Sequence, residues 1–129
     1  MNISQAAQQT GLSSKTIRYY ESIDLVHPAS RGDNGYRVYR EKQVRQLRFI
    51  HHARELDFTL DECRELLELY NNNARKSADV KAITLEKITS IDAKINHLKV
   101  MRDCLAQLTE CCHGDDQPDC PILDRLADH

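Results

Sequence analysis

Residues 3–21 of the chain read ISQAAQQTGLSSKTIRYYE, and this stretch decides the fold of the N-terminal part. Its first eight residues predict a short helix that ends at Gly11, because glycine adopts the left-handed conformation that closes many helices. Ser13 and Ser14 are good N-cap residues for a second short helix that continues through Glu21. Two short helices joined by a turn of three or four residues that contains glycine are typical of a helix-turn-helix. We therefore expect this motif at the start of the chain.

The second helix of this motif carries the side chains that a DNA-reading helix needs. Serine hydroxyls and the cationic groups of lysine and arginine bind phosphate oxygens or base edges, and tyrosine adds a flat ring with a hydroxyl donor. The residues of this helix expected to contact DNA are Ser14, Lys15, Arg18, Tyr19 and Tyr20. Many helical hairpins share this pattern, so it does not by itself identify a DNA-binding motif, and the residues that follow it also bear on that conclusion.

Residues 31–39, RGDNGYRVY, predict a β-hairpin directly after the helix-turn-helix. Asn34-Gly35 is the strongest short signal for a hairpin turn, and residues 36–39 alternate in the way that a strand does. A hairpin in this place forms a wing, and its tip would present arginines to a phosphate backbone. The side chains expected to hold the DNA backbone are Arg31, Tyr36, Arg37 and Arg54.

The composition agrees with a mainly α-helical protein. Of the 129 residues, 40% are hydrophobic and only 5% aromatic, and there is no tryptophan, which disfavours a β-sandwich or barrel. No run of about eighteen apolar residues is present, so we expect no membrane-spanning helix. The polar N-terminus does not resemble a secretory signal peptide, and we expect a cytoplasmic protein.

Charge is distributed unevenly along the chain. Residues 1–54 contain nine Lys or Arg and four Asp or Glu, a net charge of +5, whereas residues 55–129 contain nine basic and sixteen acidic residues, a net charge of −7. A basic N-terminal part beside an acidic remainder predicts a polyanionic partner for that part only. Together with the winged helix-turn-helix, this asymmetry indicates double-stranded DNA as a partner.

Three further helices are expected between the wing and the C-terminal cysteines. One covers residues 41–56, and the capping box that starts at Thr59 begins another, which ends near residue 71. The last runs from about residue 78 to 110, with Ser77 as its cap, and would be about 50 Å long. Its apolar residues with heptad spacing are Ile88, Ile91, Ile95 and Leu98. A helix this long with one apolar stripe pairs with another helix, so we expect a homodimeric coiled coil, either parallel or antiparallel.

Five cysteines in a chain expected in the cytoplasm are more often packed thiols, metal ligands or redox groups than disulfides. Cys63 and Cys104 fall within helical patterns, where packing is expected. Cys112 and Cys120 enclose a seven-residue loop, and Pro121 suits the first position of a short helix after it. Two soft thiolates on a short loop suit Cu(I), which accepts linear two-coordinate binding, whereas Zn(II) usually takes four ligands. Cys112 and Cys120 are therefore the predicted metal ligands.

The order of these features resembles the MerR family of transcriptional regulators. The resemblance is carried by Ile17-Arg18-Tyr19-Tyr20-Glu21, by Asn34-Gly35-Tyr36-Arg37-Val38-Tyr39 and by the long helix, and it extends over residues 1–127. Within the family, Ser77 and residues 112–121, CHGDDQPDCP, are similar to the copper-efflux regulators. In zinc- and mercury-responsive relatives the position of Ser77 is typically a cysteine that supplies a further thiolate.

What the resemblance implies is a homodimer with an antiparallel coiled coil that binds promoter DNA and acts with RNA polymerase. Residues 1–70 would form the winged helix-turn-helix DNA-binding domain, residues 71–110 the hinge and dimerisation helix, and residues 111–129 the metal-binding loop and short C-terminal helix. The signal would be Cu(I), or Ag(I) or Au(I), which share linear thiolate chemistry. Such a regulator is not an enzyme, and it activates copper-efflux or detoxification genes by distorting promoter DNA.

Other interpretations stay open at this stage. Cys111 or His113 could supply a third ligand, although adjacent helical residues point about 100° apart. A sensor of divalent metals, or an iron–sulfur redox sensor, would belong to the same family, but an iron–sulfur cluster usually takes four cysteines. A thiol oxidoreductase would need a Cys-x-x-Cys motif, which the sequence lacks.

Overall fold

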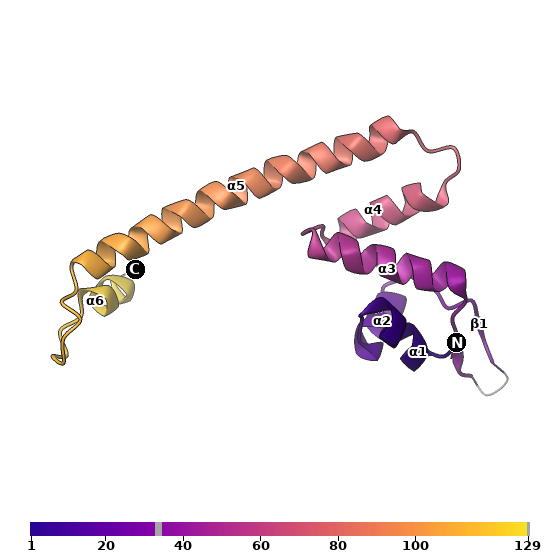
Figure 1. The fold of residues 1–129 in the computed structure, drawn as a ribbon, viewed down its shortest axis with the longest axis horizontal. Helices are drawn as coiled ribbons and strands as arrows, with labels where there is room; N and C mark the ends of the chain where they lie inside the picture. Colours follow the sequence, from indigo (N-terminus) through magenta and orange to yellow (C-terminus); the bar gives the residue numbers. More distant parts are fainter. Residues whose placement is uncertain (33–34, 129) are drawn as a thin grey trace. The chain divides into compact units, whose positions relative to one another are not determined.

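The computed structural model describes residues 1–32 and 35–128 and confirms a mainly α-helical fold with a short β-hairpin (Figure 1). Along the chain its elements are α1 (Ile3–Thr10), α2 (Ser14–Ser22), β1 (Ser30–Arg31), β2 (Arg37–Val38), α3 (Glu41–Glu55), α4 (Leu60–Asn71), α5 (Ser77–Glu110) and α6 (Pro121–Ala127). The chain divides into two compact units, Met1–Val80 and Lys81–His129, and the division falls inside α5. Among the helices described, none is long and apolar enough to span a membrane.

The predicted helix-turn-helix is confirmed, and its turn is built as the sequence indicated. Gly11 closes α1 with a φ of 77°, in the left-handed region, and its N–H donates to the carbonyl of Ala7 over 3.1 Å. Ser13 caps α2, because its hydroxyl accepts a hydrogen bond from the N–H of Thr16 over 3.0 Å. Ser14 is the first residue of α2 and not part of the cap.

The core of the first unit lies between α1, α2 and α3, and α1 packs against both of the other helices. Ala6 of α1, Ile17 of α2 and the α3 residues Leu47 and Ile50 are completely buried. Burying a large aliphatic side chain contributes about 1.5–3 kcal/mol, so these contacts hold the helix-turn-helix against α3.

The wing is a two-stranded hairpin in which β1 pairs with β2 in antiparallel orientation. The second strand is shorter than the alternation over residues 36–39 predicted and ends at Val38. The strand stops there because the backbone N–H of the next residue, Tyr39, donates to the carbonyl of Met1 over 2.7 Å. Asn34, on which the turn prediction rested, lies outside the described residues.

α4 packs against α3 with one buried face, formed by Cys63, Leu66 and Leu67. The predicted capping box at its start is confirmed. The Thr59 hydroxyl accepts from the N–H of Glu62 over 3.2 Å, and the Glu62 carboxylate accepts from the N–H of Thr59 over 2.8 Å. Cys63 is completely buried, so it is packed in the core, as its helical context indicated.

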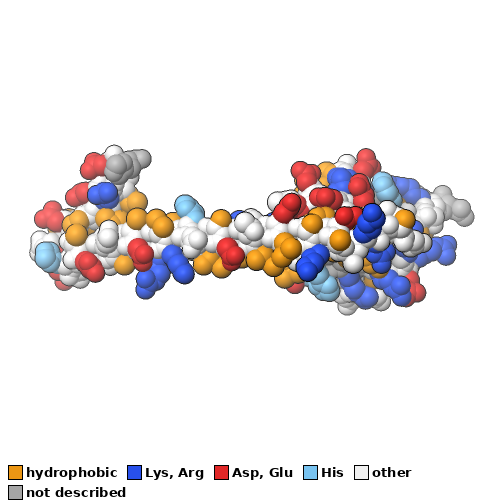
Figure 2. All heavy atoms as spheres, turned by 90° about the horizontal axis from the view of Figure 1, so that it is seen from above, with side chains coloured by type: hydrophobic (Ala, Val, Ile, Leu, Met, Phe, Trp, Pro, Cys, Tyr) orange, Lys and Arg blue, Asp and Glu red, His pale blue; other side chains and the backbone are white. Residues whose placement is uncertain are grey.

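α5 is a single helix of 34 residues. Ser77, which the sequence predicted as the N-cap residue before the helix, is its first helical residue. Large apolar side chains stay exposed along the part of α5 that lies in the second unit, and Figure 2 shows a row of hydrophobic side chains there. The exposed large apolar residues of this part are Leu85, Ile88, Ile95, Leu98, Val100, Met101 and Leu105, and of these Ile88, Ile95 and Leu98 follow the predicted heptad spacing. Such a row on a long helix is typical of one strand of a coiled coil. The short helix predicted after Cys120 is confirmed as α6, with Pro121 at its first position.

Candidate nucleic-acid interface and metal-binding loop

One face of α2 presents three of the five residues expected to contact DNA. Lys15, Arg18 and Tyr19 are exposed, and Tyr19 is 51% exposed. Ser14, at the start of the helix, is half-buried. Because the opposite face of α2 packs in the core through Ile17, the exposed residues are held on the outer side of the helix. The structure therefore brings a hydroxyl-bearing ring and two cations together on the predicted recognition helix.

The expectation that Tyr20 lies on this DNA-facing surface is wrong. Tyr20 is only 6% exposed and belongs to the core, because it follows Ile17 by three positions and so shares its buried face. Burial raises the pKa of the Tyr20 phenol above its ordinary value, and a hydrogen bond from the Arg54 side chain opposes this shift. Tyr20 therefore helps to pack the buried face of the recognition helix into the core.

Arg54 is exposed at the end of α3, and its guanidinium group is also fixed in place. Its Nη1 donates to the carbonyl of Phe58 over 2.8 Å, and the side chain also hydrogen-bonds the phenol of Tyr20. These bonds use part of the donor set of the guanidinium, which has five N–H groups. Arg54 is thus an oriented surface cation, which is a suitable arrangement for a phosphate contact.

The wing presents Arg31 and Tyr36 on its surface. Arg31 is exposed and its Nη1 reaches the carbonyl of Gly35 over 3.4 Å, while Tyr36 is 70% exposed. Arg37 differs, because its guanidinium forms an ion pair and hydrogen bond with the carboxylate of Glu21 and its side chain is only 28% exposed. Arg37 therefore joins the wing to α2 as well as lying near the expected DNA surface.

Glu21 and Tyr39 contact the predicted site residue Arg37 or its partner, although the site prediction did not include them. The phenol of Tyr39 donates to the Glu21 carboxylate that also binds Arg37. Burial raises the pKa of the Tyr39 phenol strongly, and Glu21 raises it further, whereas the nearby cations Arg37 and Arg18 oppose the rise. The pairing spans positions 18 residues apart, and no local pattern in the sequence marks it.

Basic residues outnumber acidic ones in the part of the first unit that contains these residues. Figure 2 shows Lys and Arg side chains over this unit, with Asp and Glu side chains over other parts of it. Residues 1–54, which contain the helix-turn-helix, the wing and most of α3, carry the net charge of +5 found in the sequence. A surface of this kind attracts the phosphate backbone of DNA.

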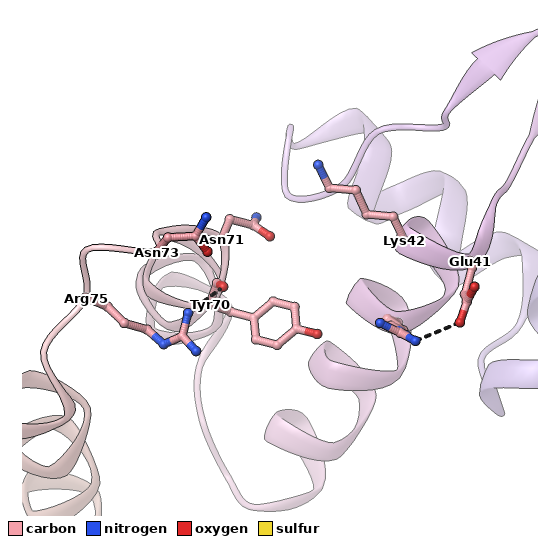
Figure 3. Close-up of a pocket in the computed structure, with 7 residues that line it drawn as sticks. Glu41, Lys42, Tyr70, Asn71, Asn73 and Arg75 are labelled. Carbon is pink, nitrogen blue, oxygen red and sulfur yellow. Dashed lines mark hydrogen bonds and ion pairs between the residues drawn. The ribbon is translucent and has the colours of Figure 1, made fainter.

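A separate polar pocket of about 530 Å³ lies between the start of α3 and the end of α4 (Figure 3). Both of its arginines are paired with neighbouring groups. Arg45 pairs with Glu41 at 2.7 Å, and Arg75 donates to the carbonyl of Tyr70 at the end of α4 over 3.3 Å. None of the residues expected to bind DNA lines this pocket. Its residue Arg75 instead hydrogen-bonds carbonyl groups at the end of α4.

The loop between α5 and α6 places Cys112 and Cys120 near its two ends. The N–H of Cys112 donates to the carbonyl of Thr109 over 3.2 Å, so this thiol lies directly after the last turn of α5. Cys120 is the N-cap residue of α6. Gly114 turns the loop with a φ of 62°, in the left-handed region. Both thiols are free and half-buried, which leaves them open to a ligand.

Cys111 is exposed and faces a different environment. It lines a cavity of about 470 Å³ at the end of α5 together with Cys104, Leu108 and, from α6, Leu126. Neither Cys112 nor Cys120 lines this cavity. Within residues 1–32 and 35–128, no group of three or more His, Cys, Asp or Glu side chains is gathered as metal ligands would be.

Comparison with known proteins gives matches over the whole chain. Two family models match, "MerR HTH family regulatory protein" over residues 1–69 and "MerR, DNA binding" over residues 44–108. The regulator HmrR of Rhizobium leguminosarum bv. viciae is 52% identical over 99% of this chain and 98% of its own length. The regulator CueR of Yersinia pestis is 54% identical over 98% of this chain and 91% of its own length.

A solved structure shares the fold. It is the transcription regulator PbrR691 from Ralstonia metallidurans CH34 in complex with lead(II), with a TM-score of 0.83 and 29% identity over 98% of both chains. The relatives that match at full length are transcriptional regulators and not enzymes. On the family models and on relatives that are about half identical over nearly its whole length, the chain belongs to the MerR family of transcriptional regulators, which bind promoter DNA as dimers.

Proposed function

We propose that this regulator senses Cu(I) through Cys112 and Cys120 and, as a homodimer on its promoter, activates copper-efflux or detoxification genes. The observation that carries the proposal is the placement of two free, half-buried thiols near the two ends of the α5–α6 loop. The similarity to the regulators named CueR and HmrR over nearly the whole chain supports it.

The donor set fits a soft monovalent ion. Thiolate sulfur is the ligand type that Cu(I) prefers, and two thiolates satisfy it in a linear arrangement, as they do Ag(I) and Au(I). Among the oxygen-bearing side chains of the loop, the Asp115 carboxylate accepts a hydrogen bond from the N–H of Gln117 over 3.0 Å. The loop thus offers its two sulfurs as soft ligands and uses aspartate to set its conformation.

Ser77 supports a monovalent ion over a divalent one. It is exposed at the first position of α5, and a serine hydroxyl is a poor ligand for a soft metal. By the family resemblance, a divalent-metal sensor would have a cysteine there to add a thiolate from the partner subunit. With Ser77, the expected ligand count stays at two.

We assign DNA binding to residues 1–70, dimerisation through an antiparallel coiled coil to residues 71–110, and metal binding to residues 111–129. The exposed apolar row of α5 supports the dimer, since pairing two such helices would remove that row from water. The regulator would work in the cytoplasm, where it meets its promoter and RNA polymerase.

The activation that we infer is a distortion of promoter DNA that lets RNA polymerase use a poorly aligned promoter. A bound ion would supply a bridge between the two thiolates. Residues 112–120 would then be held in one arrangement, and α6 would dock through its apolar side chains Ile122 and Leu123. Bending a binding site costs about 1–6 kcal/mol, and a coupling of about 1–3 kcal/mol tilts two states that are nearly balanced. The ligand acts only because it binds the two states differently.

The experiment that tests the metal site is an anaerobic Cu(I) titration of the full chain, followed by X-ray absorption spectroscopy. We expect one ion per chain, coordinated linearly by two sulfurs. The Cys112→Ser and Cys120→Ser variants lose this signal, whereas Cys111→Ser keeps it. A third sulfur or nitrogen ligand, or a coloured protein with the spectrum of an iron–sulfur cluster, would show that the two-thiolate proposal is wrong.

A further inference from the structure

Arg64 of α4 reaches across to the end of the recognition helix α2. Its Nη1 donates to the backbone carbonyl of Asp24 over 3.0 Å, and its Nη2 donates to the carbonyl of Ile23 over 2.7 Å. The two bonds join positions 40 and 41 residues apart in the sequence. Arg64 is half-buried, and its bond to Ile23 is partly shielded from water, whereas its bond to Asp24 is exposed.

The end of α2 has a backbone conformation that leaves these carbonyls available. Ile23 follows the last helical residue and donates its N–H back to the carbonyl of Tyr19 over 3.2 Å. Asp24 then adopts a φ of 58°, in the left-handed region, and the N–H of Leu25 returns to the carbonyl of Tyr20 over 2.9 Å. The carbonyls of Ile23 and Asp24 therefore point away from the helix, at its negative end.

A guanidinium group is the side chain that suits two adjacent carbonyls. Its planar fork carries parallel N–H donors, and its positive charge complements the negative end of the helix dipole. A lysine ammonium group is a compact point charge and does not reproduce the fork. Arg64 thus caps α2 from another helix, and it restrains both the position and the direction of the helix end.

The packing of the first unit gives this contact a particular role. α4 packs chiefly on α3, and α2 packs chiefly on α1. The Arg64 bonds tie α4 to α2 by their ends. The three exposed DNA-facing residues, Lys15, Arg18 and Tyr19, lie on the helix whose end these bonds hold. A small tilt of α2 would change the reach of all three residues together.

We propose that Arg64 is a positioning residue that sets the tilt of the recognition helix and thereby the sequence specificity of the regulator. Base contacts need an exact fit of donors and acceptors, whereas phosphate contacts depend mainly on charge. Loss of the fork therefore lowers affinity for the specific operator and spares affinity for random DNA. The proposal rests on DNA binding by this family and is independent of copper sensing.

The test begins with selection of an operator from a random DNA library by the wild-type full-length protein. Affinities for that operator and for random DNA of the same length are then measured over a series of salt concentrations. The variants are Arg64→Met, which keeps the length and loses the donors, and Arg64→Lys, which keeps the charge and loses the fork. Stoichiometric titration gives the active fraction of each variant and corrects for any misfolded protein.

We expect Arg64→Met to lower the ratio of operator affinity to random-DNA affinity about tenfold, with an unchanged dependence on salt. Arg64→Lys lowers the same ratio about threefold, and it carries the test if the methionine variant does not fold. If lysine restores full specificity, or if the methionine variant weakens both DNAs equally with a shallower salt dependence, Arg64 is a phosphate contact and the proposal is wrong. An unchanged ratio in both variants also overturns it.

Two further variants separate the carbonyl contact from general charge effects. Asp24→Gly keeps the backbone carbonyl and relieves the positive φ, so specificity is retained if the carbonyl is what Arg64 holds. A loss as large as that of Arg64→Met would assign the effect to the Asp24 carboxylate instead. Arg45→Met removes an exposed arginine that pairs with Glu41 on α3, and it measures what the loss of one surface charge does alone.

Discussion

The guanidinium of Arg37, on the wing, donates to the carboxylate of Glu21, near the end of the recognition helix, and the Glu21 side chain is only 8% exposed. The phenol of Tyr39 donates to the same carboxylate. One acidic side chain thus links the two elements expected to contact DNA, and it fixes the wing relative to α2.

Replacing Glu21 by glutamine tests this link. The amide loses the negative charge that Arg37 and Tyr39 both contact, and hydrogen bonds to a charged group contribute about 1.5–3 kcal/mol each. We expect the free energy of unfolding to fall by about 2 kcal/mol, measured by urea denaturation. The matched control is Glu41→Gln, whose pair with Arg45 is 79% and 62% exposed and is worth about 0–1 kcal/mol. Equal small losses in the two variants would contradict the link.

The two buried phenols predict a loss of stability in alkaline solution. The pKa of Tyr39 is raised from 10.0 by burial and then by Glu21, and burial also raises the pKa of Tyr20. In the unfolded chain both phenols lose their protons near pH 10, whereas the folded chain keeps them. Because the folded state then binds more protons, the free energy of unfolding falls as pH rises above about 10, and below that pH the contribution is fully present.

Tyrosinate absorbance measures this directly in the folded protein. Each of the variants Tyr39→Phe and Tyr20→Phe is expected to remove amplitude from the part of the titration that lies above pH 10, and to make the alkaline loss of stability smaller. If the amplitude that disappears lies near pH 10 itself, the pKa of that phenol is not raised.

Local signals predicted the fold well, because the residues that carry them act within one turn of helix. Gly11 and Thr59 each close or open a helix through bonds to residues three or four positions away, and both were identified from the sequence. Tyr20 is an exception, because its hydroxyl suggests a DNA contact, whereas its spacing of three residues from Ile17 places it on the buried face of the helix.

The contacts that sequence reasoning missed are long-range pairs. Arg64 meets Ile23 and Asp24 across about 40 positions, and Glu21 meets Arg37 across 16. Nothing in the local pattern around Arg64 distinguishes it from an exposed arginine on a helix. Such pairings depend on how the helices pack, so they emerge only with the three-dimensional structure.

Gly11 is required for two physical reasons, and a comparison with Gly35 separates them. Both have positive φ, 77° and 79°, and an alanine in the left-handed region costs about 1–2 kcal/mol. A Cβ at Gly11 would also lie 3.2 Å from Nε2 of His51, whereas at Gly35 no atom of the described residues, its chain neighbours aside, lies within 4 Å. We expect Gly11→Ala to lower the free energy of unfolding more than Gly35→Ala does, as measured by urea denaturation. Equal losses would mean that the His51 side chain moves aside at no cost.

The thiol assignments predict which cysteine variants lose the response to copper. Cys112→Ser and Cys120→Ser are expected to abolish metal-dependent transcription and to leave operator binding intact, because the residues expected to contact DNA lie in the other unit. Cys111→Ser is the control, since Cys111 lines a separate cavity with Cys104, and it should keep most of the response. A reporter assay together with an operator-binding assay measures both. If Cys111 is as indispensable as Cys112, the two-coordinate site is wrong.

The distortion mechanism makes a prediction about the promoter as well as the protein. If both the metal-free and the metal-bound dimers occupy a promoter whose spacer is too long for RNA polymerase, Cu(I) changes operator affinity only modestly and raises transcription strongly. The reason is that the ion shifts a balance between two DNA-bound arrangements by about 1–3 kcal/mol, and both remain bound. Transcription from purified components, with affinity measured on the same DNA, tests this.

Shortening the spacer to the length that polymerase prefers is expected to make transcription independent of Cu(I), because the alignment is then already correct. Release of the protein from DNA by Cu(I), with transcription rising as the site empties, would identify an ordinary repressor instead.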